Sequence, residues 1–128
     1  MAELQPIDVV LLHSASRTTS QNNTAGVGDT LNPGYTGIRV ILDMTVVTAS
    51  PSVTLTIQGK DPASGKYYTL LAGAAVTTAT TNVYTVAPNA PVTTNVSANA
   101  ELPETFRINI VANNANAGTY SVGYTLLP

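Results

Sequence analysis

The chain has 128 residues, of which 9% are charged, and a formal net charge of -2. A chain of this length fits one domain, and we expect 1–128 to form a single β domain in which 1–6 are a candidate for an extended N-terminal arm. The absence of cysteine excludes disulfides and thiolate metal sites, and five Lys and Arg residues are too few for a nucleic-acid partner.

The N-terminal residues lack the features of a leader or a membrane span. Met1 to Pro6 has no basic stretch, and the apolar run Val9 to Leu12 is far shorter than a membrane crossing needs, so we expect no membrane partner. Ile7 to Leu12 alternates in the manner of a first strand. Residues 14–37 are rich in Ser, Thr, Asn and Gly, and contain the turn sequence Asn-Pro-Gly at 32–34. They predict an irregular excursion with one short strand.

The middle of the chain carries the clearest strand patterns. Apolar residues share one parity from 38 to 46, and Val53, Leu55 and Ile57 repeat this pattern in the next segment. Asp61 to Gly65 then places Pro and Gly where a tight turn with a left-handed exit requires them. A β-hairpin into a strand over 66–71 is therefore predicted.

The last third predicts three more strands. Residues 72–92 are rich in Ala and Thr, with one strand expected at 83–86 before two prolines that cannot donate to a sheet. Residues 95–104 are a candidate for a helical turn. Alternation then returns over 106–111 and 119–126, on either side of an Asn-rich hairpin turn at 113–118.

The spacing of these segments indicates the fold class. Thr is the commonest residue with 20 copies, and Val has 14, a β-branched excess that favours pleated sheet over helix. About seven or eight strands separated by turn sequences, with no amphipathic helix, predict an all-β protein. We expect an antiparallel β-sandwich or a jelly-roll-like barrel.

The sequence contains few groups suited to catalysis. His13 is the single histidine, and Asp8, five residues away, would point to the opposite face of the same strand. Glu101 and Glu104 are close in sequence, but a solvated turn at Pro103 explains them as well as a catalytic pair does. No acidic segment has calcium-loop spacing. We therefore expect no enzyme, no catalytic residue, no cofactor and no metal.

Aromatic residues offer candidate contact sites. Tyr67 and Tyr68 are adjacent, so in a strand their side chains point to opposite faces and one ring is expected to point outward. Tyr120 and Tyr124 share a face of the last strand, where core packing and an aromatic platform for a sugar or a partner are both open.

Three segments resemble small head proteins of tailed bacteriophages. They are Ser52 to Leu71 (SVTLTIQGKDPASGKYYTLL), Leu102 to Ile108 (LPETFRI) and Thr119 to Tyr124 (TYSVGY). This resemblance implies a capsid decoration, or cement, protein that binds the major capsid protein on the outer surface of the virion after synthesis in the host cytoplasm. It also implies a homo-oligomer, with a trimer favoured over a dimer.

A charge-poor surface agrees with this role, because the chain has roughly 6,400 Å² of expected surface for 12 formal charges. The alternatives are a carbohydrate-binding β-sandwich, against which the absence of Trp counts, and a phage tail or head-closure component. The candidate partner-binding residues belong to the N-terminal arm and the central hairpin: Leu4, Gln5, Pro6, Lys60, Asp61, Lys66, Tyr67 and Tyr68.

Overall fold

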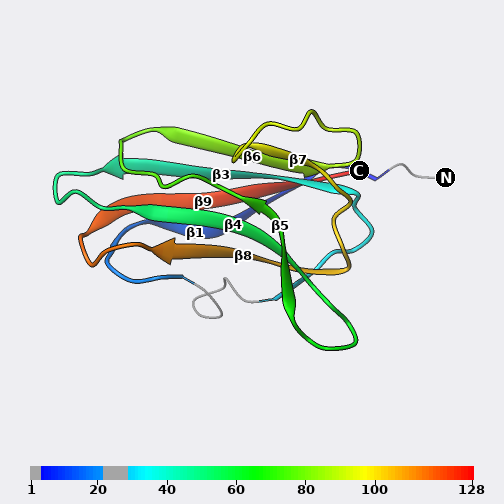
Figure 1. The fold of residues 1–128 in the computed structure, drawn as a ribbon. Coiled ribbons are helices and arrows are strands. Elements are labelled where there is room, and N and C mark those ends of the chain that lie inside the picture. The colour runs from blue at the N-terminus through cyan, green and yellow to red at the C-terminus, as the bar shows by residue number, and fades with distance from the viewer. Residues whose placement is uncertain (1–3, 22–28) are drawn as a thin grey trace.

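Alternating side chains build two β-sheets that pack face to face (Figure 1). The computed structural model describes residues 4–21 and 29–128. The five-stranded sheet has the order β1 (Ile7–Arg17), β9 (Gly118–Leu127), β3 (Gly37–Val46), β6 (Thr81–Ala87) and β7 (Ser97–Asn99). The four-stranded sheet has the order β2 (Thr30–Leu31), β8 (Thr105–Ala112), β4 (Val53–Lys60) and β5 (Tyr67–Ala72). This architecture confirms the all-β sandwich predicted from the sequence.

The antiparallel strand pairs are nested along the chain. The innermost pair is β4 with β5, followed by β3 with β6, β2 with β8 and finally β1 with β9. Further antiparallel pairing of β3 with β9 and of β4 with β8, and parallel pairing of β6 with β7, complete the two sheets. The chain therefore forms one long folded-back ribbon that is rolled into a sandwich.

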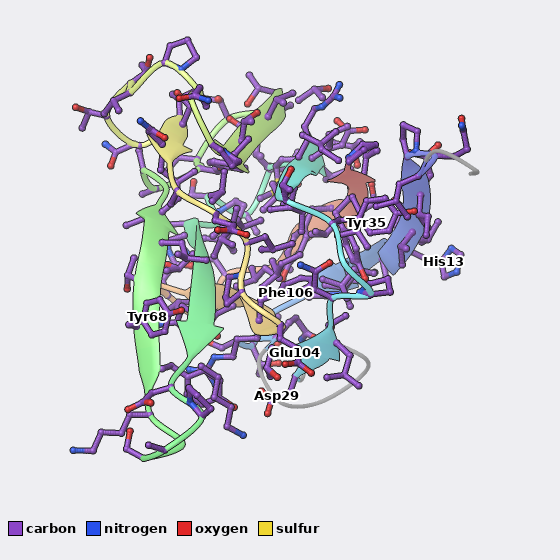
Figure 2. The ribbon with its side chains drawn as sticks, turned by 90° about the vertical axis from the view of Figure 1, so that its right-hand side faces the viewer. His13, Asp29, Tyr35, Tyr68, Glu104 and Phe106 are labelled. Carbon is purple, nitrogen blue, oxygen red and sulfur yellow. The ribbon has the colours of Figure 1, made fainter. Side chains whose placement is uncertain are left out.

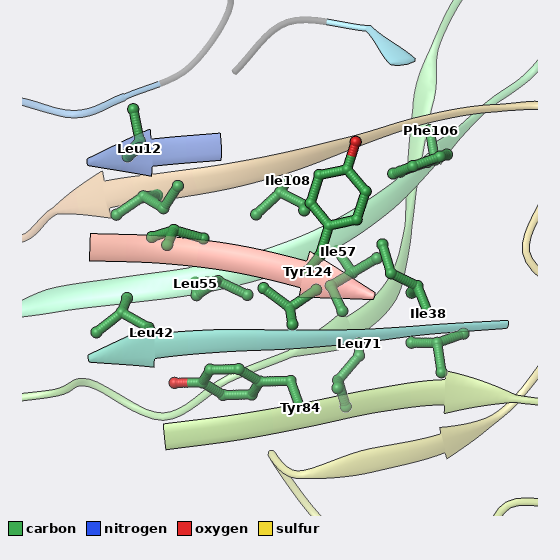
Figure 3. Packing of buried hydrophobic residues seen from close by; sticks show 14 of the residues in the cluster. Leu12, Ile38, Leu42, Leu55, Ile57, Leu71, Tyr84, Phe106, Ile108 and Tyr124 are labelled. Atoms are coloured by element: carbon green, nitrogen blue, oxygen red, sulfur yellow. The ribbon is translucent and has the colours of Figure 1, made fainter. Parts of the chain in front are cut away.

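One face of each sheet supplies the core. Along β3 from Ile38 to Met44 and along β9 the even-numbered residues are buried, and along β4 the odd-numbered residues are buried, as period-two alternation requires. These side chains meet between the sheets (Figure 3), where the rings of Phe106 and Tyr124 lie edge to face with centroids 6.1 Å apart. Within the described ranges, no helix has the length and apolarity needed to cross a membrane.

Three local predictions differ from the structure. The first strand continues to Arg17 instead of ending at 12, because register shifts after Val10 and Leu12 break the alternation without ending the pairing with β9. Between Thr93 and Ser97 the chain makes one tight turn, with Asn95 at a φ of 63°, in place of a turn of helix. The segment β7 follows and pairs parallel to β6, giving nine described strands where about seven or eight were expected.

The β4–β5 hairpin extends past the body of the sandwich (Figure 1). A register shift lies at the step from Ile57 to Gln58, after which Gly59 pairs with Tyr68 and Lys60 pairs with Tyr67. Such irregularities bend a strand pair and increase its local twist. The hairpin end thus presents both of its faces outside the main core.

Candidate functional site

A turn built on Asp61 closes the β4–β5 hairpin. The Asp61 carboxylate accepts hydrogen bonds from the Ala63 amide at 3.0 Å and from the Ser64 hydroxyl at 2.6 Å. Gly65, at a φ of 73°, makes the left-handed exit that the sequence predicts. The Ser64 hydroxyl, followed by the Ala63 amide, holds the pKa of the Asp61 carboxyl below its usual range. The turn is therefore braced by its own side chains.

The outer face of the hairpin carries a polar cluster around Tyr67. The Tyr67 hydroxyl donates to one carboxylate oxygen of Asp29, while the Lys60 ammonium lies 2.8 Å from the other. The Arg107 guanidinium stacks 3.5 Å from the centroid of the Tyr67 ring and donates through Nε to the Gln58 side chain at 2.7 Å. Register explains the grouping, because Lys60 is paired with Tyr67 and Gln58 with Arg107.

Charge in this cluster is fixed over the neutral pH range. Hydrogen bonds from Lys60 and then Tyr67 lower the pKa of Asp29. The bond to Asp29 raises the pKa of Tyr67, and the same carboxylate raises the pKa of Lys60. Asp29 therefore stays anionic and Tyr67 stays a neutral phenol. These shifts are opposite to those that would prepare a general acid or a phenolate base, and they suit recognition by fixed charge.

Tyr68 lies on the other face of the hairpin, over Gly59. A Cβ atom added at Gly59 would lie 2.5 Å from Cζ of Tyr68 and 2.9 Å from Cγ of Pro103, so only glycine admits the ring in this position. The Tyr68 side chain is nevertheless 45% exposed, because the hairpin extends past the core at this point. The two adjacent tyrosines thus lie on opposite faces, as alternation predicts.

The exposed side of Tyr68 contributes to a cleft of about 540 Å³. Its walls come from the hairpin turn, from the start of β8 and from the chain that leads into β2. Figure 2 shows Asp29 and Glu104 at this end of the molecule. The lining combines one aromatic ring, apolar groups and three carboxylates, and its main members are Asp29, Leu31, Asp61, Tyr68 and Glu104.

Five of the eight predicted contact residues come together on this hairpin, namely Lys60, Asp61, Lys66, Tyr67 and Tyr68. The predicted arm lies elsewhere, at the start of β1 in the five-stranded sheet, and its residues 1–3 fall outside the described ranges. Leu4, Gln5 and Pro6 are exposed, and the backbone carbonyl of Gln5 accepts a hydrogen bond from the buried Tyr35 hydroxyl.

The groups weighed for catalysis lie apart from one another. His13 is exposed and points away from the body (Figure 2), while the Asp8 carboxylate accepts a hydrogen bond of 2.6 Å from Thr125. Glu104 lines the cleft, and Glu101 is exposed. Among the described residues, no three His, Asp or Glu side chains are grouped in a way that suits a metal ion.

Sequence reasoning missed three members of the polar cluster. Gln58 and Arg107 were recognised as members of strands, but their contact depends on the pairing of β4 with β8, which a single sequence does not give. Asp29 follows a segment without periodicity and precedes the short strand β2. Alternation alone would have placed Gln58 on the face of Lys60, since the two are two residues apart in one strand.

Comparison with known proteins gives no family assignment. No family model matches the chain, and no curated protein matches it. One similar solved structure is that of infectious bursal disease virus Gt strain, with a TM-score of 0.43 and 14% identity over 96% of this chain. The alignment covers 33% of that chain, so this protein spans about one third of its length. A likeness at this distance says nothing about function.

Proposed function

We propose that this protein is a structural component of a virion that decorates and stabilises the outer surface of a phage capsid by binding the major capsid protein. It acts by contact and catalyses no reaction. The observation that carries the proposal is the low density of charge: 12 formal charges share 6647 Å² of surface, about 550 Å² each. An average domain of this size has about one charge per 200 Å².

Exposed apolar side chains support the same role. Leu31 is 71% exposed, Val92 is 77% exposed and Val10 is 61% exposed, and they belong to different parts of the sandwich. Interfaces are depleted in charge at their centres, whereas ordinary solvated surface is not. A protein with contacts on several sides suits a shell in which each copy touches more than one neighbour.

The strand order supports a finer description of the fold as a jelly roll. In a jelly roll, an antiparallel ribbon is rolled up so that its nested strand pairs alternate between two sheets, and the pairs of this protein do so. Strand β7, which lies between β6 and β8 in the chain, is an addition to this pattern. Jelly rolls occur in viral capsid domains and in lectins. Since a fold does not determine a function, the choice between these two roles depends on the surface.

In the proposed mechanism, the braced β4–β5 hairpin is the main contact with the shell. Its turn and its polar cluster are held by internal hydrogen bonds, so little conformational entropy is lost on binding. Many copies on one particle each contribute a modest contact area and brace neighbouring capsid subunits. The protein would be made in the host cytoplasm and would act on the outer surface of the virion.

Co-sedimentation with purified expanded capsids tests the proposal. We expect saturable binding, and we expect Tyr68→Ala to weaken it by about 2 kcal/mol, or roughly thirtyfold, as for a buried aromatic residue at an interface. Thr78→Ala, on the exposed segment before β6, is the matched control and should bind as the unmodified protein does. Failure of the unmodified protein to sediment with the capsids would refute the decoration role.

A second candidate function, carbohydrate binding, is favoured by the cleft. The exposed ring of Tyr68 offers a stacking face, and the carboxylates of Asp29, Asp61 and Glu104 offer acceptors for sugar hydroxyls. Retention on a glycan array that Tyr68→Ala abolishes, without binding to capsids, would replace the decoration role by this one. Labelling of the protein on intact particles separates head decoration from a tail or head-closure position.

A further inference from the structure

The outer face of the five-stranded sheet carries an apolar row that runs across four strands. Val10 on β1 pairs with Gly123 on β9, Gly123 pairs with Ile41 on β3, and Ile41 pairs with Val83 on β6. Val10 and Val83 are 61% and 44% exposed, and Ile41 is half-buried. Gly123 adds no side chain, which leaves a depression of about 360 Å³ between Val10 and Ile41. This row lies on the opposite face of the sheet from the core.

Opposite charges flank this row at equal distances along β3. Arg39 precedes Ile41 by two residues and Asp43 follows it by two, so each charge lies about 7 Å from the row and the two are about 14 Å apart. They are too far apart to pair within one chain. Arg39 is exposed, and the ion pair found among the described residues, Lys60 with Asp29, is on the other sheet.

The charge pattern along β3 is complementary to itself under a twofold rotation. We propose that a second copy of this chain packs the same sheet face against this one, about a twofold axis that runs along the apolar row. The rotation lays the row on its own copy, and it places Arg39 of each copy over Asp43 of the other. Gly123 then faces Gly123 of the second copy, which lets the two sheets approach closely at β9.

The arrangement meets the usual constraints on sheets and on symmetry. Face-to-face sheets keep their strands within about 30° of one another, a rotation that the long Arg39 side chain accommodates. A contact in which each copy uses the same patch is isologous and closes at two copies. The charge pattern therefore selects a dimer over the trimer that the sequence resemblance implies.

The area of this sheet face limits the affinity expected for the dimer. Four strands, each with about seven residues in contact, present roughly 450 Å² in projection, or about 900 Å² for both copies together. Interfaces of this size are at the low end of specific association, so we expect dissociation in the micromolar range. Partly exposed ion pairs add mainly orientation and selectivity.

Sedimentation equilibrium of the full chain from micromolar to millimolar concentration tests the proposal. The unmodified protein should reach a dimer, and Arg39→Asp and Asp43→Arg should each weaken the dimer roughly tenfold or more, because like charges then face each other twice. Lys66→Asp makes the same charge change as Arg39→Asp on the hairpin turn and should leave the dimer intact.

Mixing the two variants gives the decisive measurement. The aspartate introduced at position 39 of one chain then faces the arginine introduced at position 43 of the other, and the native Asp43 of the first chain faces the native Arg39 of the second. The mixture should therefore dimerise about as tightly as the unmodified protein, whereas each variant alone dimerises at least tenfold more weakly, and the double variant should regain the original affinity. Formation of the mixed dimer also shows that both single variants are folded.

Two results would overturn the proposal. One is a monomer or a trimer of the unmodified protein over this concentration range, and the other is a mixture of the two variants that stays monomeric. No capsid enters this assay, so its failure leaves the decoration role open to its own test.

Discussion

Gly59→Ala tests whether Tyr68 is held in place by the absence of a side chain beneath it. The added methyl group would lie 2.5 Å from Cζ of Tyr68 and 2.9 Å from Cγ of Pro103, and both distances are shorter than two carbon atoms can approach without a clash. The tyrosine ring must therefore swing away or the hairpin must shift. Either change alters the wall of the cleft as well as the stability of the fold.

Two opposing effects set the magnitude. Overpacking of this kind costs about 1–3 kcal/mol, whereas replacing glycine by alanine without strain stabilises by about 0.4–1 kcal/mol through the unfolded chain. We therefore expect a net loss of about 1–2 kcal/mol at Gly59. Gly123 is the matched control, because a Cβ there meets the carbonyl oxygen of Val9 at 3.4 Å, close to an ordinary contact. At protein concentrations below the proposed dimer range, Gly123→Ala should be neutral or slightly stabilising.

Urea unfolding of the two variants decides between these expectations. The midpoint for Gly59→Ala should fall by about 1 M with an unchanged slope, while that for Gly123→Ala should not fall. In a Tyr68→Ala background the cost of Gly59→Ala should shrink, which a double-mutant cycle measures directly. If Gly59→Ala is as stable as the unmodified protein, or if its cost is independent of Tyr68, then Tyr68 is not held in place by the absence of a side chain at Gly59.

Two further predictions concern local hydrogen bonds. Because the pKa of Asp29 is lowered in the folded state, its contribution to stability is present above the unfolded pKa of about 3.9 and is lost as the pH falls through the folded pKa. Tyr67→Phe should raise the pKa of Asp29 toward its ordinary value, and Lys60→Met should raise this pKa further. NMR titration of the Asp29 carboxyl group measures both changes. An unchanged pKa in both variants would show that Asp29 does not bind Lys60 and Tyr67 in solution. Asn32 accepts from the Tyr35 amide at 2.8 Å and donates to the Tyr35 carbonyl at 2.6 Å, so Asn32→Ala should cost about 1–3 kcal/mol in thermal or urea unfolding. Asn32→Asp keeps the acceptor but places a carboxylate oxygen against the Tyr35 and Leu102 carbonyls, so it should cost at least as much near neutral pH; a smaller loss would show that the donated bonds are unimportant.

Most strands could be predicted from the alternation of apolar and polar residues, and each mispredicted strand has a local cause. The strands over 38–46, 53–58 and 106–111 were predicted because one face of each is buried over most of its length, so the period of two is clear. The first strand was cut short because its bulges exchange the inward and outward parities partway along. Strand β7 was missed because three residues cannot show a period and because its partner is parallel.

The candidate site likewise contains features that could be predicted from the sequence and features that could not. Turn chemistry at Asp61 to Gly65 and the opposed rings of Tyr67 and Tyr68 depend on neighbours in sequence, and both could be predicted. The contact of Arg107 with Tyr67 depends on which strands are adjacent in the sheet, and pairing partners far apart in sequence are not encoded in local pattern. Asp29 joins the cluster from outside any periodic segment, so no period marks it.

The nested pairing also constrains the order in which the chain can fold. Among the described strands, β1 is made first and pairs with β9 alone, and Leu126 of β9 is paired with Ile7 across almost the whole length of the chain. During synthesis the apolar segment around Leu12 therefore has no strand partner until β9 has left the ribosome. The innermost hairpin can close early, and each outer pair then pays a larger loop-closure entropy than the pair inside it. Folding is therefore expected to proceed from the hairpin outward, with β1 joining last, and premature contacts of the unpaired first strand are the main risk of misfolding.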